Sequence, residues 1–200
     1  MTTLLIQTDN TPLSVELPSL SQMTEAQFYE FCAANRELRI ERTAIGEVIV
    51  MAPAFSDTGD RNFKLTVQLG VWTDQDGTGL GFDSSAGFTL PNGAIRAPDA
   101  AWIKLDRWNA LTEEQKASFA PICPNFVIEL RSASDTLATL QNKMQEYIEN
   151  GAALGLLIDR KHRTVYRYRL NREIESLDHP ETVSCDPELP GFVLNMTKIW

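Results

Sequence analysis

Two acidic residues stand beside short apolar runs that indicate core strands. Asp99 lies between Pro98 and the run 100–103, and Glu129 follows the run Phe126-Val127-Ile128. A buried carboxylate is unfavourable unless a metal ion or a basic side chain compensates it. Two carboxylates that meet at one sheet edge repel each other unless a proton or a cation lies between them. Because oxygen ligands favour Mg²⁺ or Mn²⁺ over zinc, the pair predicts a metal site, with a salt bridge as the alternative.

A lysine on the helix expected after Glu129 lies within reach of the same place. This helix is predicted over 135–150, where Leu140 and Tyr147 flank Lys143 on the apolar face. There the ammonium would orient an attacking water or stabilise charge that develops on a phosphate. Spacing alone favours the more common arrangement, in which the lysine stem covers the core and the ammonium points to solvent.

Two helices and a hairpin are expected before the first of these acids. Thr24 and Gln27 form a capping box and predict a helix that begins there. Residues 38–51 are rich in strand formers and turn at Gly46, which predicts a hairpin. A second helix is expected over 58–73, and because it is apolar on two sides we expect it to be well buried.

The remaining strands determine the fold class. Strands are expected at 80–83 and at 95–103, the second pairing only after Pro98. The continuous apolar run 153–158 is typical of a central strand covered on both faces. A meander of strands followed by strand–helix–strand over 126–158 predicts an α/β (α+β) fold with a mixed central β-sheet flanked by helices.

Length and composition narrow the class of protein. The 200 residues, 43% hydrophobic, predict a single domain over residues 1–200, with 1–17 as a loose arm or an edge strand. No apolar run is long enough to cross a membrane. Three widely spaced cysteines and no secretory signal predict reduced thiols in a cytoplasmic protein. The net charge of −9 argues against a protein that coats nucleic acid, but it allows an enzyme that contacts DNA locally.

Much of the chain resembles one protein family. Pro98-Asp99 and Glu129-Leu130-Arg131, with a basic residue nearby, resemble the PD-(D/E)XK nuclease signature. The chain is also similar, over about residues 20–200, to the Uma-type restriction endonuclease-like family of that superfamily. The similar stretches are LRIERTAIGEVIVMAP, TGDRN, GFDSSAGFTLPNGAIRAPDAAWI, FAPICPNFVIELRSASDTLATLQNKMQEYIENGAALGLLID and LPGFVLNMTKIW. The resemblance implies a restriction endonuclease-like domain that cleaves DNA with Mg²⁺ or Mn²⁺.

The resemblance also implies roles for individual residues. Asp99 and Glu129 match the family's metal-binding acids. The superfamily motif has a lysine two residues after the second acid, where this chain has Arg131, and arginine stays protonated and cannot act as a general base. The resemblance places the lysine role on the following helix, at Lys143, and leaves Arg131 to contact substrate.

Other candidate residues lie outside this motif. Glu41 matches the glutamate of the family's N-terminal hairpin, and the resemblance implies that it completes the acidic cluster as a third metal ligand. Glu47 is the alternative for this role. The more ordinary arrangement for Glu41 is a solvent-facing pair with a basic residue on the neighbouring strand. Arg61 and Asn62 begin the second helix and are expected to contact phosphate, unless they are first-turn surface residues. The basic residues between 160 and 172 form either a phosphate-contacting surface or a solvated hairpin.

Two hypotheses for the function follow. In the first, the protein is a Mg²⁺-dependent DNA endonuclease in which Asp99, Glu129 and Glu41 hold one or two metal ions. Lys143 then positions the attacking water or stabilises the transition state. In the second, it is a catalytically inactive binding or assembly module, including a homodimer. There Asp99, Glu129 and Lys143 form a closed ion-pair network.

Overall fold

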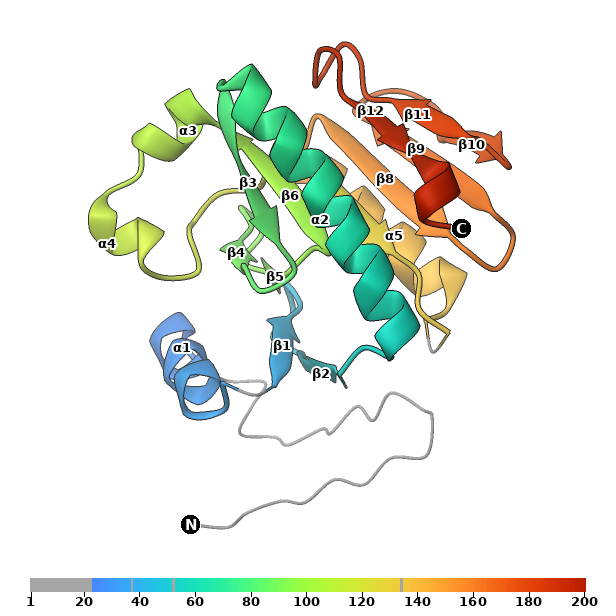
Figure 1. The fold of residues 1–200 in the computed structure, drawn as a ribbon. Helices are drawn as coiled ribbons and strands as arrows, with labels where there is room; N and C mark the ends of the chain where they lie inside the picture. Colours follow the sequence, from blue (N-terminus) through green and yellow to red (C-terminus); the bar gives the residue numbers. More distant parts are fainter. Residues whose placement is uncertain (1–22, 37, 52, 134) are drawn as a thin grey trace.

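A central six-stranded β-sheet organises the chain. The structure is a computed structural model, and it describes residues 23–36, 38–51, 53–133 and 135–200. Helix α2 (Ser56–Asp76) crosses one face of this sheet, and α5 (Leu137–Glu149) covers the other (Figure 1). This confirms the predicted mixed central sheet flanked by helices. The arm expected over 1–17 lies outside the described residues.

The six strands combine antiparallel and parallel pairing. Their spatial order is β10 (Glu175–Asp178), β9 (Thr164–Arg169), β8 (Leu154–Asp159), β7 (Phe126–Leu130), β6 (Ala100–Lys104), β3 (Gly79–Asp83). β7 and β8 are parallel and α5 connects them, whereas the other neighbours are antiparallel. Every residue of β8 is buried, so the prediction of a central strand at 153–158 is confirmed.

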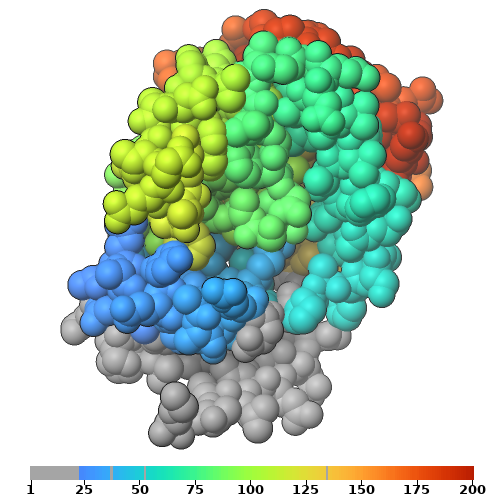
Figure 2. All heavy atoms as spheres, turned by 60° about the vertical axis from the view of Figure 1, so that its left-hand side comes forward, coloured from blue at the N-terminus to red at the C-terminus, as the bar shows by residue number. Residues whose placement is uncertain are grey.

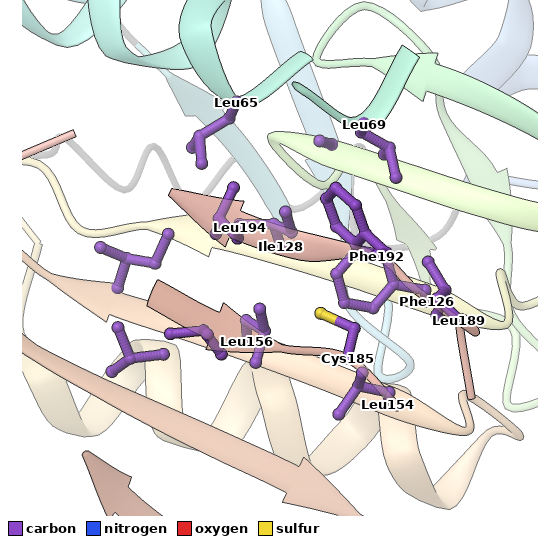
Figure 3. Packing of buried hydrophobic residues seen from close by; sticks show 14 of the residues in the cluster. Leu65, Leu69, Phe126, Ile128, Leu154, Leu156, Cys185, Leu189, Phe192 and Leu194 are labelled. Atoms are coloured by element: carbon purple, nitrogen blue, oxygen red, sulfur yellow. The ribbon is translucent and has the colours of Figure 1, made fainter. Parts of the chain in front are cut away.

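The side chains of β7 alternate between the two faces of the sheet. Phe126, Ile128 and Leu130 pack in the cluster under α2 that Figure 3 shows from close by. Val127 packs on the opposite face, in the cluster formed with α5. Because the side-chain period of a strand is two, Glu129 shares the α5 face with Val127. The acid that ends this core strand is therefore covered by the helix that carries Lys143.

A smaller four-stranded sheet lies at one end of the larger one (Figure 1). Its order is β2 (Val48–Met51), β1 (Arg39–Arg42), β5 (Ile95–Arg96), β4 (Phe88–Thr89). The hairpin of β1 and β2 is the predicted one. The prediction that 95–103 pairs only after Pro98 is wrong, because β5 pairs with β1 and β4 before the proline and β6 joins the other sheet after it. Proline lacks the N–H that a continuous ladder needs, so the chain changes sheets there.

The helix α2 is buried on one side only. Leu65 and Leu69 pack into the core, whereas Phe63, Val67 and Val71 are 68%, 44% and 54% exposed. The expected burial of both apolar sides is therefore wrong. An outer helix has a single face of the sheet to cover, and the described elements place nothing over its other side.

Short helices and strands complete the described chain. Helix α1 (Glu25–Ala34) begins with the predicted capping box of Thr24 and Gln27. None of the described helices has the length and apolar character needed to cross a bilayer. The remaining elements are α3 (Leu105–Asn109), α4 (Glu113–Lys116), β11 (Thr182–Ser184), β12 (Val193–Asn195) and the 3-10 helix η1 (Met196–Lys198).

Candidate functional site

Asp99 lies against the end of β7, next to Glu129. Its backbone N–H donates to the carbonyl of Ile128 at 3.0 Å, and its carboxylate Oδ2 accepts from the N–H of Leu130 at 2.9 Å. The residues on both sides of Glu129 therefore hold Asp99 in place. The structure brings together the two acids that the sequence singled out, although 30 positions separate them.

Glu129 has one oxygen engaged and one unengaged. Its Oε1 lies 2.7 Å from the ammonium of Lys143 and accepts from the hydroxyl of Tyr147 at 3.1 Å. Its Oε2 accepts no hydrogen bond from any residue that the structure describes. Burial raises the pKa of Glu129 to about 7, and the neighbouring charges of Asp99 and Glu41 add to the rise while Lys143 opposes it. Burial is the largest cause, so the charged form of this carboxylate is disfavoured mainly by its loss of contact with water.

Lys143 lies between two carboxylates rather than in solvent. Its Nζ is 2.7 Å from Oε1 of Glu129 and 2.8 Å from Oε1 of Glu41. Burial by itself lowers the pKa of Lys143, but the two carboxylates outweigh burial and the pKa rises above its ordinary value. The side chain therefore stays protonated and acts as a fixed cation, not as a general base.

Glu41, rather than Glu47, belongs to this cluster. The carboxylate of Glu41 is buried and accepts from Lys143, from the backbone N–H of Ala97 at 2.9 Å and from Nη1 of Arg96 at 3.2 Å. Burial alone would raise its pKa, but Lys143 and Arg96 outweigh burial and the pKa is lowered. Glu47 is exposed, just after the hairpin turn.

Four further residues support the acids, and the sequence analysis did not select them. Arg39 donates to Asp99, Tyr147 to Glu129, and Arg96 pairs with both Glu41 and Glu146. Two spacings were available as signals. Arg39 and Glu41 are two apart on one strand and so share a face. Glu146 and Tyr147 follow Lys143 by three and four positions, which places all three on one side of a helix.

Asn62 reaches the site from the first turns of α2. Its Nδ2 donates to Oδ1 of Asp99 at 3.1 Å. Its Oδ1 is buried and has no hydrogen-bond partner in the described part of the chain. The neighbouring Arg61 points elsewhere, because its Nε donates to the carbonyl of Ile199 at 2.7 Å and its Nη1 pairs with Asp57.

Three other arginines predicted to contact phosphate are paired with acids outside the cluster. Arg131 pairs with buried Asp159 at 2.8 Å, and Arg160 pairs with Asp57 at 2.7 Å. Arg169 pairs with acids of the C-terminal segment, one of which is Glu188 at 2.9 Å. Ion pairs therefore locally neutralise these three arginines, so the acidic cluster and Asn62 are the predicted residues that the fold unites.

The oxygens of the site fit a hard cation bound in part by the protein. Within the described ranges, no three His, Cys, Asp or Glu side chains are grouped so that they could hold a metal on their own. Mg²⁺, however, is commonly held by one or two carboxylates while waters and substrate phosphates complete its shell. Asp99, the unengaged oxygen of Glu129 and the unpartnered Oδ1 of Asn62 are oxygen donors of the kind that such a cation takes. Glu41 as a third metal ligand stays a prediction, since its oxygens already serve Lys143, Arg96 and Ala97.

Comparison with known proteins identifies the family. None of the curated proteins compared with the chain matches it. A solved structure described as that of a putative nuclease belonging to DUF820, from Anabaena variabilis ATCC 29413, superposes with a TM-score of 0.69. It shares 18% sequence identity over 82% of this chain and 90% of that one, which shows a common fold. The family model Uma2, described as "Putative restriction endonuclease", matches residues 25–197. The chain belongs to the Uma2 family, in agreement with the resemblance seen in its sequence.

Proposed function

We propose that the protein is a metal-dependent DNA endonuclease whose active site comprises Asp99, Glu129 and Lys143. One observation carries the proposal: a turn, a strand end and a helix bring these three residues together. Family membership and a structural neighbour described as a putative nuclease support it. Mg²⁺ or Mn²⁺ is the proposed cofactor, because the donor atoms are oxygens.

The chain's own residues would divide the work at this site. Asp99 and Glu129 would hold the cation, which when bound activates water and neutralises charge on a phosphate. Lys143, kept protonated by two carboxylates, would stabilise the charge that develops on the phosphate oxygens. Tyr147 fixes one oxygen of Glu129, while the other accepts no hydrogen bond from the described residues. Glu41, held by Arg96 and a backbone amide, keeps the ammonium in place.

Plasmid nicking tests the proposal directly. Wild-type protein with Mg²⁺ or Mn²⁺ is expected to convert supercoiled DNA to the nicked form, and Asp99→Ala and Glu129→Ala are each expected to lose at least about a hundredfold in rate, since the metal supplies several kcal/mol. Glu113→Ala is the matched control, because it removes an exposed acid of α4 that pairs with Lys116 outside the cluster. Equal nicking by wild type and both acid variants would contradict the proposal.

Metal affinity is expected to depend on pH. Because the pKa of Glu129 is raised to about 7, a cation must displace a proton from this carboxylate below that pH. The Mn²⁺ association constant should therefore be nearly constant above about pH 7.5 and fall by about tenfold per unit of pH below about 7. Calorimetry at about pH 6, in two buffers of different ionisation enthalpy, should detect release of about one proton per ion. An affinity that stays constant from about pH 5.5 to 8 would contradict this assignment.

A second candidate function is a catalytically inactive module that keeps the nuclease fold for binding or assembly. The observation in its favour is the double ion pair of Lys143, which already bridges Glu41 and Glu129. Titration calorimetry separates the two candidates. No heat of Mn²⁺ binding would support the inactive module, and a micromolar site that disappears in Glu129→Ala would exclude it.

A further inference from the structure

Arg39 differs from the other cations of the site in its access to solvent. Its side chain is 33% exposed, compared with 10% for Arg96 and 11% for Lys143. It comes from β1 and meets Asn62, from α2, at the same oxygen of Asp99. In Figure 2 these two elements, β1 in blue and the start of α2 in teal, border a hollow in the surface.

The guanidinium of Arg39 also has unused donors. It makes two hydrogen bonds to described residues: Nη1 donates to Asp99 at 3.3 Å, and Nη2 donates to the carbonyl of Ala97 at 3.0 Å. Its Nε is buried without a partner in the described ranges. A guanidinium has five N–H donors, and its bonds to an anion are typically about 2.7–2.9 Å long. The contact with Asp99 is therefore long, and three donors have no acceptor among the described residues: the buried Nε and one N–H each on Nη1 and Nη2.

Asp99 would keep its position if Arg39 turned to another anion. Asn62 donates to the same oxygen, Oδ1, at 3.1 Å, and the N–H of Leu130 donates to Oδ2 at 2.9 Å. Neither oxygen of the carboxylate would be left without a hydrogen bond. Arg96 has no such freedom, since both Glu41 and Glu146 depend on it.

The charge balance of the site favours an incoming anion once a cation is bound. The cluster holds four acids and three bases, namely Glu41, Asp99, Glu129 and Glu146 with Arg39, Arg96 and Lys143. With all of them ionised, one negative charge is in excess. A divalent cation would reverse this to one positive charge, and a single phosphodiester would restore neutrality.

We propose that Arg39 contacts the phosphodiester of the DNA substrate, exchanging its long bond to Asp99 for a forked contact to phosphate oxygens. The planar guanidinium matches two oxygens of one phosphate, which an ammonium cannot do. This inference rests on the proposed function for its substrate, but it concerns binding and does not require turnover.

Duplex binding measures this contact without cleavage. Fluorescence anisotropy with a labelled duplex, in Ca²⁺ and in EDTA, gives the affinity and its dependence on salt for wild type, Arg39→Ala, Arg39→Lys and Arg107→Ala. The last variant is the matched control, because it also removes one arginine charge, from a side chain that donates to the carbonyl of Cys123 and belongs to α3, away from β1 and the start of α2 (Figure 1). Tryptophan fluorescence unfolding and Mn²⁺ titration of each variant report separately on the fold and on the metal site.

Arg39→Ala is expected to weaken duplex binding by about tenfold or more and to lower the salt slope by about one. Arg39→Lys should restore the salt slope, because the positive charge returns. It should not restore the full affinity, because an ammonium cannot contact two phosphate oxygens as a guanidinium does. Arg107→Ala should resemble wild type. The proposal would be overturned if Arg39→Ala bound the duplex with the same affinity and salt slope as wild type. It would also be overturned if the wild-type protein bound no duplex. Duplex binding that depends on Arg39 in a protein that never cleaves would refute the endonuclease and leave the phosphate contact standing.

Discussion

Lys143→Met is expected to lower the free energy of unfolding by about 3–5 kcal/mol, because it leaves buried carboxylates without their cation. Glu129 and Glu41 both lie within 2.8 Å of the ammonium that this substitution removes. Methionine keeps the length and apolar body of the side chain, so the loss reports on charge and not on a cavity. Urea unfolding, followed by circular dichroism, measures the effect.

The response of this variant to metal distinguishes the two candidate functions. If the acids form a metal site, Mn²⁺ should stabilise Lys143→Met more than wild type, since the cation replaces the lost positive charge. If the cluster is a closed ion-pair network, Mn²⁺ should leave both midpoints unchanged. Lys64→Met is the control, because its ion pair with Asp60 is solvent-exposed and is worth at most about 1 kcal/mol. A loss in Lys143→Met no larger than that of Lys64→Met would mean that the buried bridge does not form in solution.

Glu41→Gln and Glu47→Gln form a second matched pair, with very different expected results. Glu41→Gln removes the buried negative charge shared by Lys143 and Arg96 and puts an NH₂ donor where one of them needs an acceptor, so it should cost about 3–5 kcal/mol of stability. Glu47→Gln changes an exposed residue just after a turn and should stay within about 0.5 kcal/mol of wild type. Similar unfolding midpoints for the two variants would contradict the assignment of Glu41 to the cluster.

The same pair determines what Glu41 does. If it positions Lys143, Glu41→Gln should lower kcat while the Mn²⁺ dissociation constant stays near the wild-type value. If it is a third metal ligand, as the resemblance implies, the dissociation constant should rise by about tenfold or more. Calorimetry and single-turnover nicking together separate these outcomes.

The sequence by itself determined the features that depend on local chemistry. The capping box at Thr24, the turn at Gly46 and the buried strand at 153–158 follow from contacts and propensities within a few residues, and the structure has all three. Residue type and spacing singled out Asp99, Glu129 and Lys143, and the family resemblance implied their roles; the fold unites all three although they are distant in sequence. The helical period had already placed Lys143 at the edge of the buried face of its helix.

Tertiary structure alone decided which charges meet. Whether Glu41 or Glu47 joined the acids depended on how the hairpin docks through β5 onto the sheet, and no local signal encodes that docking. Three arginines look like phosphate contacts in the sequence, yet each has a partner far along the chain. Arg131 pairs with Asp159, Arg160 pairs with Asp57, and Arg61 donates to the carbonyl of Ile199 near the C-terminus. Ion pairs act over a few ångströms in space, whereas propensity acts over a few residues of chain. The sequence therefore predicted the acids that the fold brings together, and only the folded chain identified Arg39, Arg96 and Tyr147 as their partners.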